Sequence, residues 1–167
     1  MSTGTVVWLT GLPASGKTTF AEAVRAALIE TARFPAVLDG DSVRDALIPR
    51  PGYSEDERDR FYATLANLAA MLAHQGLIVL VPASANRRFY RERARKAAPR
   101  FIEVYLSTAL ATCITRDPKG LYAGGGRSET SNLPGVGAEY EIPEHPDVVA
   151  QDGGDMAAVA RVLALIA

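Results

Sequence analysis

The sequence contains very little cysteine and has almost no excess of either charge. Cys113 is the one cysteine among 167 residues, so no disulfide can form within the chain, as is typical of a reducing compartment. The formal net charge of −1 argues against a general nucleic-acid or membrane-surface binder. The sequence has no run of about 18 apolar residues, so it does not predict a membrane-spanning helix. Met1–Thr5 lacks the basic start of a secretory signal. We therefore expect a cytoplasmic chain.

Short apolar runs alternate with helical patterns along the whole chain. Ser54 and Glu57 have the spacing of a capping box, and Asp155 is the expected cap of the last helix. Alternating strands and helices predict a three-layer α/β/α sandwich around a mainly parallel five-stranded sheet, with residues 1–167 as one domain. Strands are expected at 5–10, 36–38, 77–81, 101–106 and 147–150, and helices at 16–30, 41–48, 54–74, 86–98, 108–115 and 155–166.

The segment Gly11–Thr18 matches the phosphate-loop pattern G-x-x-x-x-G-K-[ST], between a predicted strand and a predicted helix. Its glycines let backbone N–H groups curl around a polyphosphate, and the helix N-terminus adds a partial positive charge. Lys17 would reach the β- and γ-phosphates of ATP, and the Thr18 hydroxyl would bind Mg²⁺. The expected ATP-binding residues of this P-loop NTPase-type fold are Gly11, Leu12, Pro13, Ala14, Ser15, Gly16, Lys17, Thr18 and Thr19.

Several features narrow the class of phosphate-loop protein. The GTPase base-recognition motif N-K-x-D is not visible, and the chain is too short for a helicase or a typical ATPase motor core. Residues 119–139 are rich in glycine, serine and asparagine, which predicts a mobile lid. This combination suits a small-molecule kinase that closes over its substrate.

Four further segments resemble the adenylylsulfate (APS) kinase family. Residues 38–44 read L-D-G-D-S-V-R, close to the family's L-D-G-D-x-V-R, and residues 116–122 match its R-D-P-K-G-L-Y. The G-Y-S at 52–54 with Arg58 resembles G-F-S-x-x-D-R, and Y-E-I-P-E-H-P at 140–146 echoes Y-E-x-P-E-x-P. The resemblance spans about residues 6–149. It implies transfer of the ATP γ-phosphate to the 3′-hydroxyl of APS, giving PAPS and ADP in sulfate assimilation.

The resemblance also implies roles for charged residues at the predicted strand ends. Asp39 and Asp41 follow the second strand, where ligands of α/β folds bind. One would take the acceptor's proton and the other would hold Mg²⁺, directly or through water, although both could simply cap the next helix. We favour Asp41 as the base, Asp39 for the metal, and Lys17 as the third catalytic residue. Arg116 and Lys119 open the lid and would stack on adenine and neutralise the transferred phosphoryl group.

The acceptor-binding residues are expected to come from three segments. Arg44 and Arg58 would grip the sulfate or phosphate of the acceptor, and the alternative is that both are solvated. Ser84 and Arg87 follow the third strand and would also touch the acceptor. A polar loop residue is the alternative for Ser84, and this serine is phosphorylated in some relatives. Asn132 belongs to the lid.

The same segments depart from the family pattern. Phe61 replaces an asparagine that lines the APS pocket, and Leu133 replaces an aromatic ring that stacks on the adenine of APS. In nucleic-acid-binding proteins, losing the stacking of one base on an aromatic ring weakens the binding free energy by about 1–3 kcal/mol. We expect Phe61 to supply a substitute surface. These departures keep two alternatives open: a kinase of this scaffold with a different nucleotide conjugate or small hydroxylated acceptor, and a catalytically silent nucleotide-binding protein.

The arginines on the predicted helix 86–98 have two interpretations. Arg87, Arg91 and Arg95 lie at spacings of four, which could form a nucleic-acid patch but more often forms a solvated face. We favour the solvated face, so the expected partner is a small nucleotide acceptor, with no nucleic acid and no membrane. Cys113 is expected in the core. The oligomeric state stays open, and a homodimer is one alternative.

Overall fold

The computed structural model describes residues 3–126 and 133–167. The chain alternates strands and helices, with a short π-helical turn at Tyr122–Gly126. The elements in order are β1 (Thr5–Gly11), α1 (Lys17–Glu30), β2 (Ala36–Val37), α2 (Gly40–Ala46), α3 (Glu55–His74), β3 (Ile78–Pro82), α4 (Arg88–Ala97), β4 (Phe101–Leu106), α5 (Leu110–Arg116), β5 (Val148–Ala150) and α6 (Met156–Ile166).

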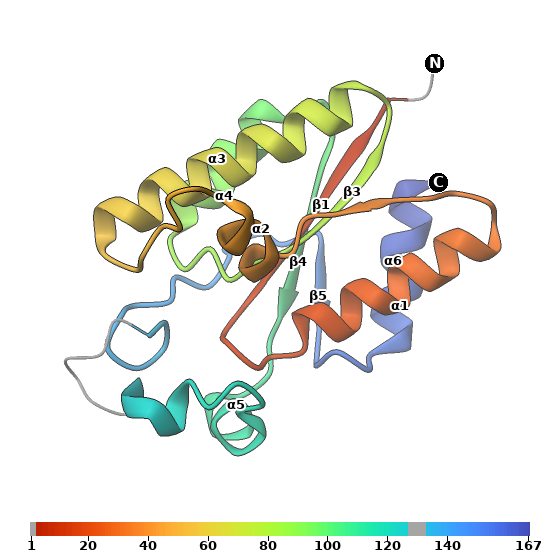
Figure 1. Ribbon diagram of the computed structural model, residues 1–167. Helices are drawn as coiled ribbons and strands as arrows, with labels where there is room; N and C mark the ends of the chain where they lie inside the picture. Colours follow the sequence, from red (N-terminus) through yellow and green to blue (C-terminus); the bar gives the residue numbers. More distant parts are fainter. Residues whose placement is uncertain (1–2, 127–132) are drawn as a thin grey trace.

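The five strands form one parallel sheet in the order β2-β3-β1-β4-β5. Helices α1 and α6 cover one face of the sheet and α3 and α4 cover the other, as Figure 1 shows. This arrangement confirms the predicted three-layer fold. The chain leaves β1 for the edge strand β2 on one side, returns through β3, and then crosses to β4 on the other side of β1, so the strand order reverses beside β1. Ligands of open α/β sheets bind at such a point.

Side chains of the central strand β1 alternate between two apolar cores. Val7 and Leu9 pack toward α1 and α6, whereas Val6 and Trp8 pack toward α3 and α4. The Trp8 indole N–H donates to the carbonyl of Ala83 at 3.2 Å, so its polar atom is satisfied in the interior. Burial on both faces explains why this strand is a continuous apolar run.

Local signals for the helix ends agree with the structure. The Ser54 hydroxyl accepts from Glu57 N–H while the Glu57 carboxylate accepts from Ser54 N–H, so the predicted capping box at the start of α3 is confirmed. Asp155 caps α6 by accepting from Ala158 N–H at 3.0 Å. Within residues 3–126 and 133–167, no helix is long and apolar enough to cross a membrane.

One expectation about α4 is wrong. The basic helix does not present a wholly solvated face, because Arg91 is 1% exposed and its Nε lies 3.0 Å from Glu103 Oε2 on β4. Arg93 and Arg95 are about one-third exposed and also face carboxylates, Asp59 and Glu103 respectively. The arginine spacing therefore reflects ion pairs with neighbouring elements.

Candidate functional site

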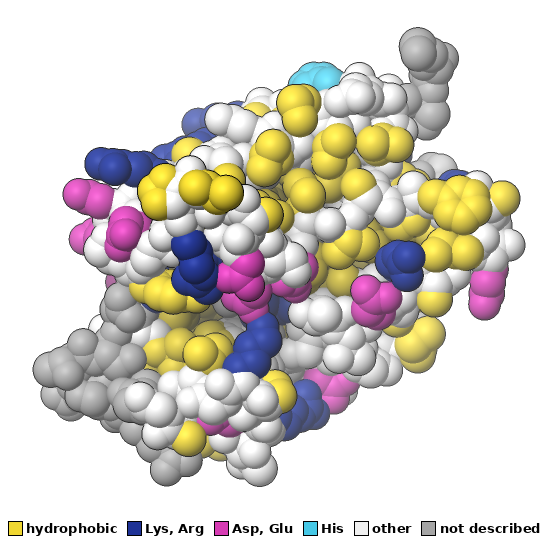
Figure 2. Space-filling view, in the orientation of Figure 1, with side chains coloured by type: hydrophobic (Ala, Val, Ile, Leu, Met, Phe, Trp, Pro, Cys, Tyr) yellow, Lys and Arg dark blue, Asp and Glu magenta, His cyan; other side chains and the backbone are white. Residues whose placement is uncertain are grey.

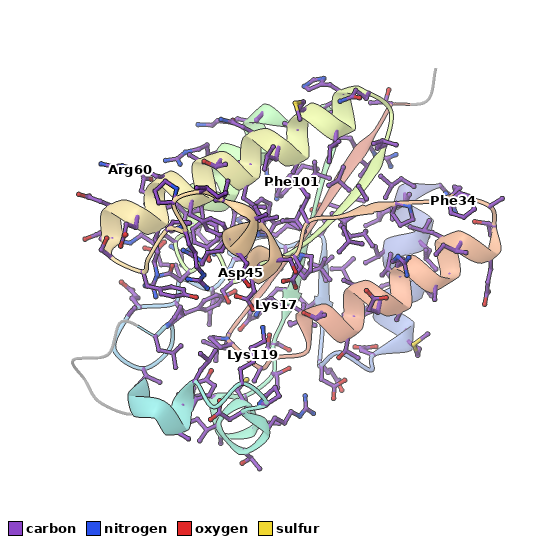
Figure 3. The ribbon with its side chains drawn as sticks, in the orientation of Figure 1. Lys17, Phe34, Asp45, Arg60, Phe101 and Lys119 are labelled. Atoms are coloured by element: carbon purple, nitrogen blue, oxygen red, sulfur yellow. The ribbon has the colours of Figure 1, made fainter. Side chains whose placement is uncertain are left out.

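The candidate site lies at the carboxyl end of the sheet, where β1 runs into the phosphate loop and then α1. The segment after β2 brings α2 to the same end, and the segment after β4 brings α5. Figure 3 shows Lys17 and Lys119 near each other below α2, at this end of the sheet. Three motifs that are far apart in the sequence therefore meet in one place.

Two glycines of the phosphate loop are required by close packing. A Cβ at Gly11 would lie 2.7 Å from Ser15 Oγ and 2.9 Å from the Leu106 carbonyl oxygen. Gly16 has φ +97° and its Cβ would lie 2.6 Å from the backbone nitrogen of Gly153. A larger residue at either position would deform the loop.

Lys17 is folded back into this loop. Its Nζ donates to the carbonyl of Leu12 at 2.7 Å and to the carbonyl of Gly11 at 3.1 Å. Burial lowers the pKa of Lys17 to about 8, although nearby Asp39 and Asp41 favour the charged form. The amine must leave these carbonyls to reach an incoming phosphate.

Asp39 caps α2 and also contacts the phosphate loop. Its Oδ1 accepts from the N–H groups of Asp41 at 3.0 Å and Ser42 at 3.1 Å, which caps α2. Its Oδ2 accepts from the Thr18 hydroxyl at 3.3 Å. The carboxylate is therefore fixed by the cap while one oxygen faces the phosphate loop.

Asp41 and Lys119 form an ion pair across the site, and both side chains are more than half exposed. The hydrogen bond from Lys119 Nζ to Asp41 Oδ2 raises the pKa of Lys119. In Figure 2, basic and acidic side chains gather in the hollowed part of the surface between α2 and α5. The lid entry thus contacts the first turn of α2.

Two buried arginines lie on the α3 side of the site. Arg44 is 3% exposed and donates to the carbonyls of Gly52 at 2.6 Å and Pro51 at 3.3 Å. Arg58 is also buried, and its pKa is lowered chiefly by burial and further by the positive charge of Arg44. Two guanidinium groups held close together away from bulk water favour binding of an anion.

Aromatic rings hold the guanidinium of Arg44 in place. It lies 3.9 Å from the ring centroid of Phe61 and 4.4 Å from that of Tyr53. Phe61 is only 2% exposed, so its ring supports Arg44 and offers no open face to a base, contrary to our expectation. The Tyr53 ring is 44% exposed, and the sequence analysis did not assign it a role. Leu133 is partly buried, whereas Asn132 lies outside the described residues.

Ser84 and Arg87 lie in the loop between β3 and α4, and each already has a partner. The Ser84 carbonyl accepts from the Thr10 hydroxyl at 2.5 Å. The Arg87 guanidinium pairs with Glu55 at 2.7 Å, and both of these side chains reach solvent. Arg87 must exchange this carboxylate to bind an acceptor anion.

The loop between β5 and α6 also belongs to the site, and the sequence analysis missed it. Asp152 lies 3.6 Å from Arg116, which borders a shallow cavity of about 310 Å³ beside α5. Gly153 packs on Gly16, and a Cβ there would lie 2.9 Å from Thr19 Cβ. The signal was the pair of glycines between a strand and a helix.

The predicted lid contacts the phosphate loop from both ends. In its entry arm (residues 119–126), the buried Tyr122 hydroxyl donates to the Pro13 carbonyl at 2.9 Å. Its return arm, which we take from residue 133 past the predicted end of the lid at 139 to residue 142, includes Gly135, which packs on Leu12, and a Cβ there would lie 2.5 Å from Leu12 Cδ2. The two arms of the lid therefore contact two consecutive residues of the phosphate loop, Leu12 and Pro13.

Comparisons with known proteins point to one family. A family model described as adenylylsulphate kinase matches residues 3–151. An adenylyl-sulfate kinase of Enterobacter sp. (strain 638) is 42% identical over 149 residues, covering 87% of this chain and 73% of its own. A probable adenylyl-sulfate kinase of Archaeoglobus fulgidus is 41% identical over 144 residues, covering 86% and 93%.

Solved structures extend the likeness to three dimensions. The Mycobacterium tuberculosis APS kinase in complex with AMPPNP and APS superposes with a TM-score of 0.89 and 35% identity over the full length of both chains. A gluconokinase from Sinorhizobium meliloti has a TM-score of 0.67 and 22% identity, covering 99% of this chain and 95% of its own, which shows a shared fold.

Proposed function

The chain belongs to the adenylylsulphate kinase family, and we propose that it transfers the γ-phosphoryl group of ATP to the 3′-hydroxyl of APS, yielding PAPS and ADP. The observation that best supports this is the meeting of Lys17, Asp41 and Lys119 at one end of the sheet. A phosphate cation, a carboxylate that can accept a proton and a second cation on the lid are what phosphoryl transfer to an alcohol requires.

On the nucleotide side, backbone N–H groups of residues 11–19 would surround the phosphates. Lys17 would leave the Leu12 carbonyl for the β- and γ-phosphates, and Lys119 would leave Asp41 for the transferred group. Arg116, at the end of α5, pairs with Asp152 and would leave it to stack on the adenine. Each cation thus exchanges a protein partner for the nucleotide.

The residues beside the loop fit a magnesium ion. The Thr18 hydroxyl and the Asp39 carboxylate are oxygen ligands, which Mg²⁺ prefers, and they lie 3.3 Å apart. Within residues 3–126 and 133–167, no group of three or more His, Cys, Asp or Glu side chains could hold a metal by itself. The remaining ligands would be phosphate oxygens and water, and the ion would neutralise charge on the phosphates.

On the acceptor side, Asp41 would accept the proton of the 3′-hydroxyl once Lys119 has moved. Arg44 and Arg58 would bind the phosphosulfate, because the charge of Arg44 acts on Arg58 and aromatic rings already orient Arg44, which would exchange the Pro51 and Gly52 carbonyls for the anion. The exposed ring of Tyr53 takes the base-stacking role that we first expected of Phe61. Leu133 would border the same base. Ser84 and Arg87 would border the acceptor from the loop between β3 and α4.

The cellular setting follows from the same activity. We place the enzyme in the cytoplasm and in sulfate assimilation, since it uses ATP and carries a single buried thiol. A homodimer is the assembly we propose, and light scattering of the purified protein tests it.

The test of the proposed function is ADP release in a coupled assay with ATP, Mg²⁺ and APS, with PAPS identified by mass spectrometry. Gluconate and other nucleotide conjugates serve as competing acceptors in the same assay. Phe61 and Leu133 stand where the family pattern has asparagine and phenylalanine, and this favours a different acceptor as the second candidate. ADP formation with another acceptor, and none with millimolar APS, would establish that candidate instead.

A further inference from the structure

A buried ion pair lies outside the residues that we assign to substrate. Arg91 of α4 and Glu103 of β4 are both nearly inaccessible to solvent, and Arg91 Nε donates to Glu103 Oε2 at 3.0 Å. Removing two charges from water is costly, so a buried pair is weak evidence of a gain in stability. The remaining atoms of the guanidinium indicate what the pair does.

The two terminal nitrogens of Arg91 bind two different segments. Nη1 donates to the Ala85 carbonyl at 2.5 Å, and Nη2 donates to the Glu141 carbonyl at 2.6 Å. Ala85 belongs to the acceptor loop (residues 84–87) and has φ +43°, a conformation that non-glycine residues rarely adopt. Glu141 belongs to the return arm of the proposed lid. One planar group therefore joins the acceptor loop to the lid.

Further hydrogen bonds reinforce the same junction. The Asn86 side-chain amide donates to the Glu139 carbonyl at 2.9 Å, and Glu141 N–H donates to the Asn86 carbonyl at 2.8 Å. The Tyr140 hydroxyl lies 2.8 Å from Thr10 Oγ1, whose proton goes to the Ser84 carbonyl. Since Thr10 immediately precedes the phosphate loop, acceptor loop, return arm and β1 are joined in one network.

We propose that Arg91 is a positioning residue for the acceptor: its guanidinium fixes the acceptor loop against the return arm, and so sets the width of the acceptor pocket without touching either substrate. This inference rests on the proposed function, because that function places the acceptor between these two segments. The nucleotide-binding residues border this network at Thr10, but among the described residues the Arg91 guanidinium bonds to Glu103, Ala85 and Glu141 and to none of residues 11–19, α5 or the β5–α6 loop.

Only arginine can make this set of contacts. Its planar fork donates from three separate nitrogens, to the Glu103 carboxylate and to two carbonyls in different directions. Lysine keeps the charge beside Glu103 but has a single nitrogen at the end of its chain. Arg91→Lys therefore loosens the junction while keeping the buried carboxylate paired, whereas Arg91→Met would leave that carboxylate with only the more distant Arg95, at 3.5 Å.

The experiment compares Arg91→Lys with Arg93→Lys in steady-state assays with ATP and APS. Arg93 is a matched control on the same helix, because it also pairs with a carboxylate, Asp59 at 2.7 Å, but this pair is half-exposed and faces α3. For Arg91→Lys we expect the KM for APS to rise on the order of tenfold, with the KM for ATP and direct binding of an ATP analogue unchanged. Arg93→Lys leaves all three at wild-type values.

Hydrogen–deuterium exchange gives a readout that needs no turnover. Arg91→Lys should speed exchange in residues 84–87 and 139–142 and leave α1 and α6 unchanged. Unaltered exchange in both segments overturns the proposal, as does an equal rise in both KM values, which a general loss of stability would cause. Wild-type protein that makes no ADP with APS contradicts the proposed function, and exchange then still decides whether Arg91 holds the two segments together.

Discussion

Lys119 Nζ donates directly to Asp41 Oδ2, although the two residues are 78 positions apart. The cation at the lid entry therefore occupies the carboxylate that we propose as the base. Binding of ATP offers Lys119 a stronger partner in the phosphates, because a phosphate group carries more negative charge than a carboxylate. The base is then released for the acceptor hydroxyl.

Asp41→Asn should lower kcat on the order of 10²–10⁴, because an amide fills the same space but cannot take a proton. The amide oxygen can still accept from Lys119, so we expect the affinity for an ATP analogue, measured by calorimetry, to stay within about twofold. Asp45→Asn is the matched control, since Asp45 lies on the same helix and pairs with Arg50 at 2.7 Å on the surface. Equal losses of ATP binding and rate would assign the proton to Asp39 instead.

ATP binding should weaken above pH 8. Burial lowers the pKa of Lys17 from 10.5 to about 8, and the phosphates need the charged amine. Affinity for ATP should thus fall by up to about tenfold per pH unit above 8, and this slope should vanish in Lys17→Ala. Titrations of an ATP analogue from about pH 6.5 to 9.5 measure both. A flat profile in the wild type would contradict the placement of Lys17.

The same titration has a defined effect on folding. Between pH 8 and 10.5 the unfolded chain keeps the Lys17 proton that the folded chain has lost. The free energy of unfolding of the nucleotide-free protein therefore gains a contribution that rises with pH across that window.

Lys17→Ala should also reduce kcat on the order of 10²–10³, the usual result of removing one group that stabilises the transition state.

Gly153→Ala should weaken ATP binding, whereas Gly154→Ala should not. A Cβ at Gly153 would lie 2.7 Å from the Gly16 carbonyl oxygen, while at Gly154 the nearest atom is Asp152 Oδ1 at 3.4 Å. Overpacking typically costs about 1–3 kcal/mol, so we expect the KM for ATP to rise on the order of tenfold in Gly153→Ala. Steady-state kinetics and melting temperatures of the pair decide, and equal behaviour of the two variants would remove the β5–α6 loop from the site.

Leu133→Phe should lower the KM for APS and leave kcat nearly unchanged, because stacking remote from the reacting hydroxyl is uniform binding. Stacking on a base contributes about 1–3 kcal/mol, so the change should be several-fold or more. Leu133→Met supplies a control of similar size without a ring. If phenylalanine and methionine behave alike, the base does not lie against this residue.

Much of the fold could be predicted from the sequence because its signals are local. The runs at β1, β3 and β4 are apolar on both faces, and Ser54 and Asp155 carry their capping chemistry within four residues. The phosphate loop is equally local, since its geometry depends on neighbouring glycines.

The features that the sequence did not predict depend on contacts between segments that are distant in the chain. Phe61 packs in the core beneath α3 with its ring against Arg44, and sequence spacing gives no sign of that contact. Arg91 follows the same spacing as its exposed neighbours, and the informative signal was Glu103, a charged residue inside the apolar strand F-I-E-V-Y-L. Gly153 matters because it packs against Gly16, which lies near the other end of the chain.

The contacts of Tyr122 and Gly135 with the dipeptide Leu12–Pro13 affect which parts of this enzyme can change during evolution. Both ends of the lid are tied to the phosphate loop, so replacements between them do not disturb the nucleotide contacts. Substitutions in this segment can then change which acceptor the enzyme prefers, while the binding of ATP stays the same. The departure at Leu133, beside an unaltered phosphate loop, is the kind of change that such divergence leaves in a sequence.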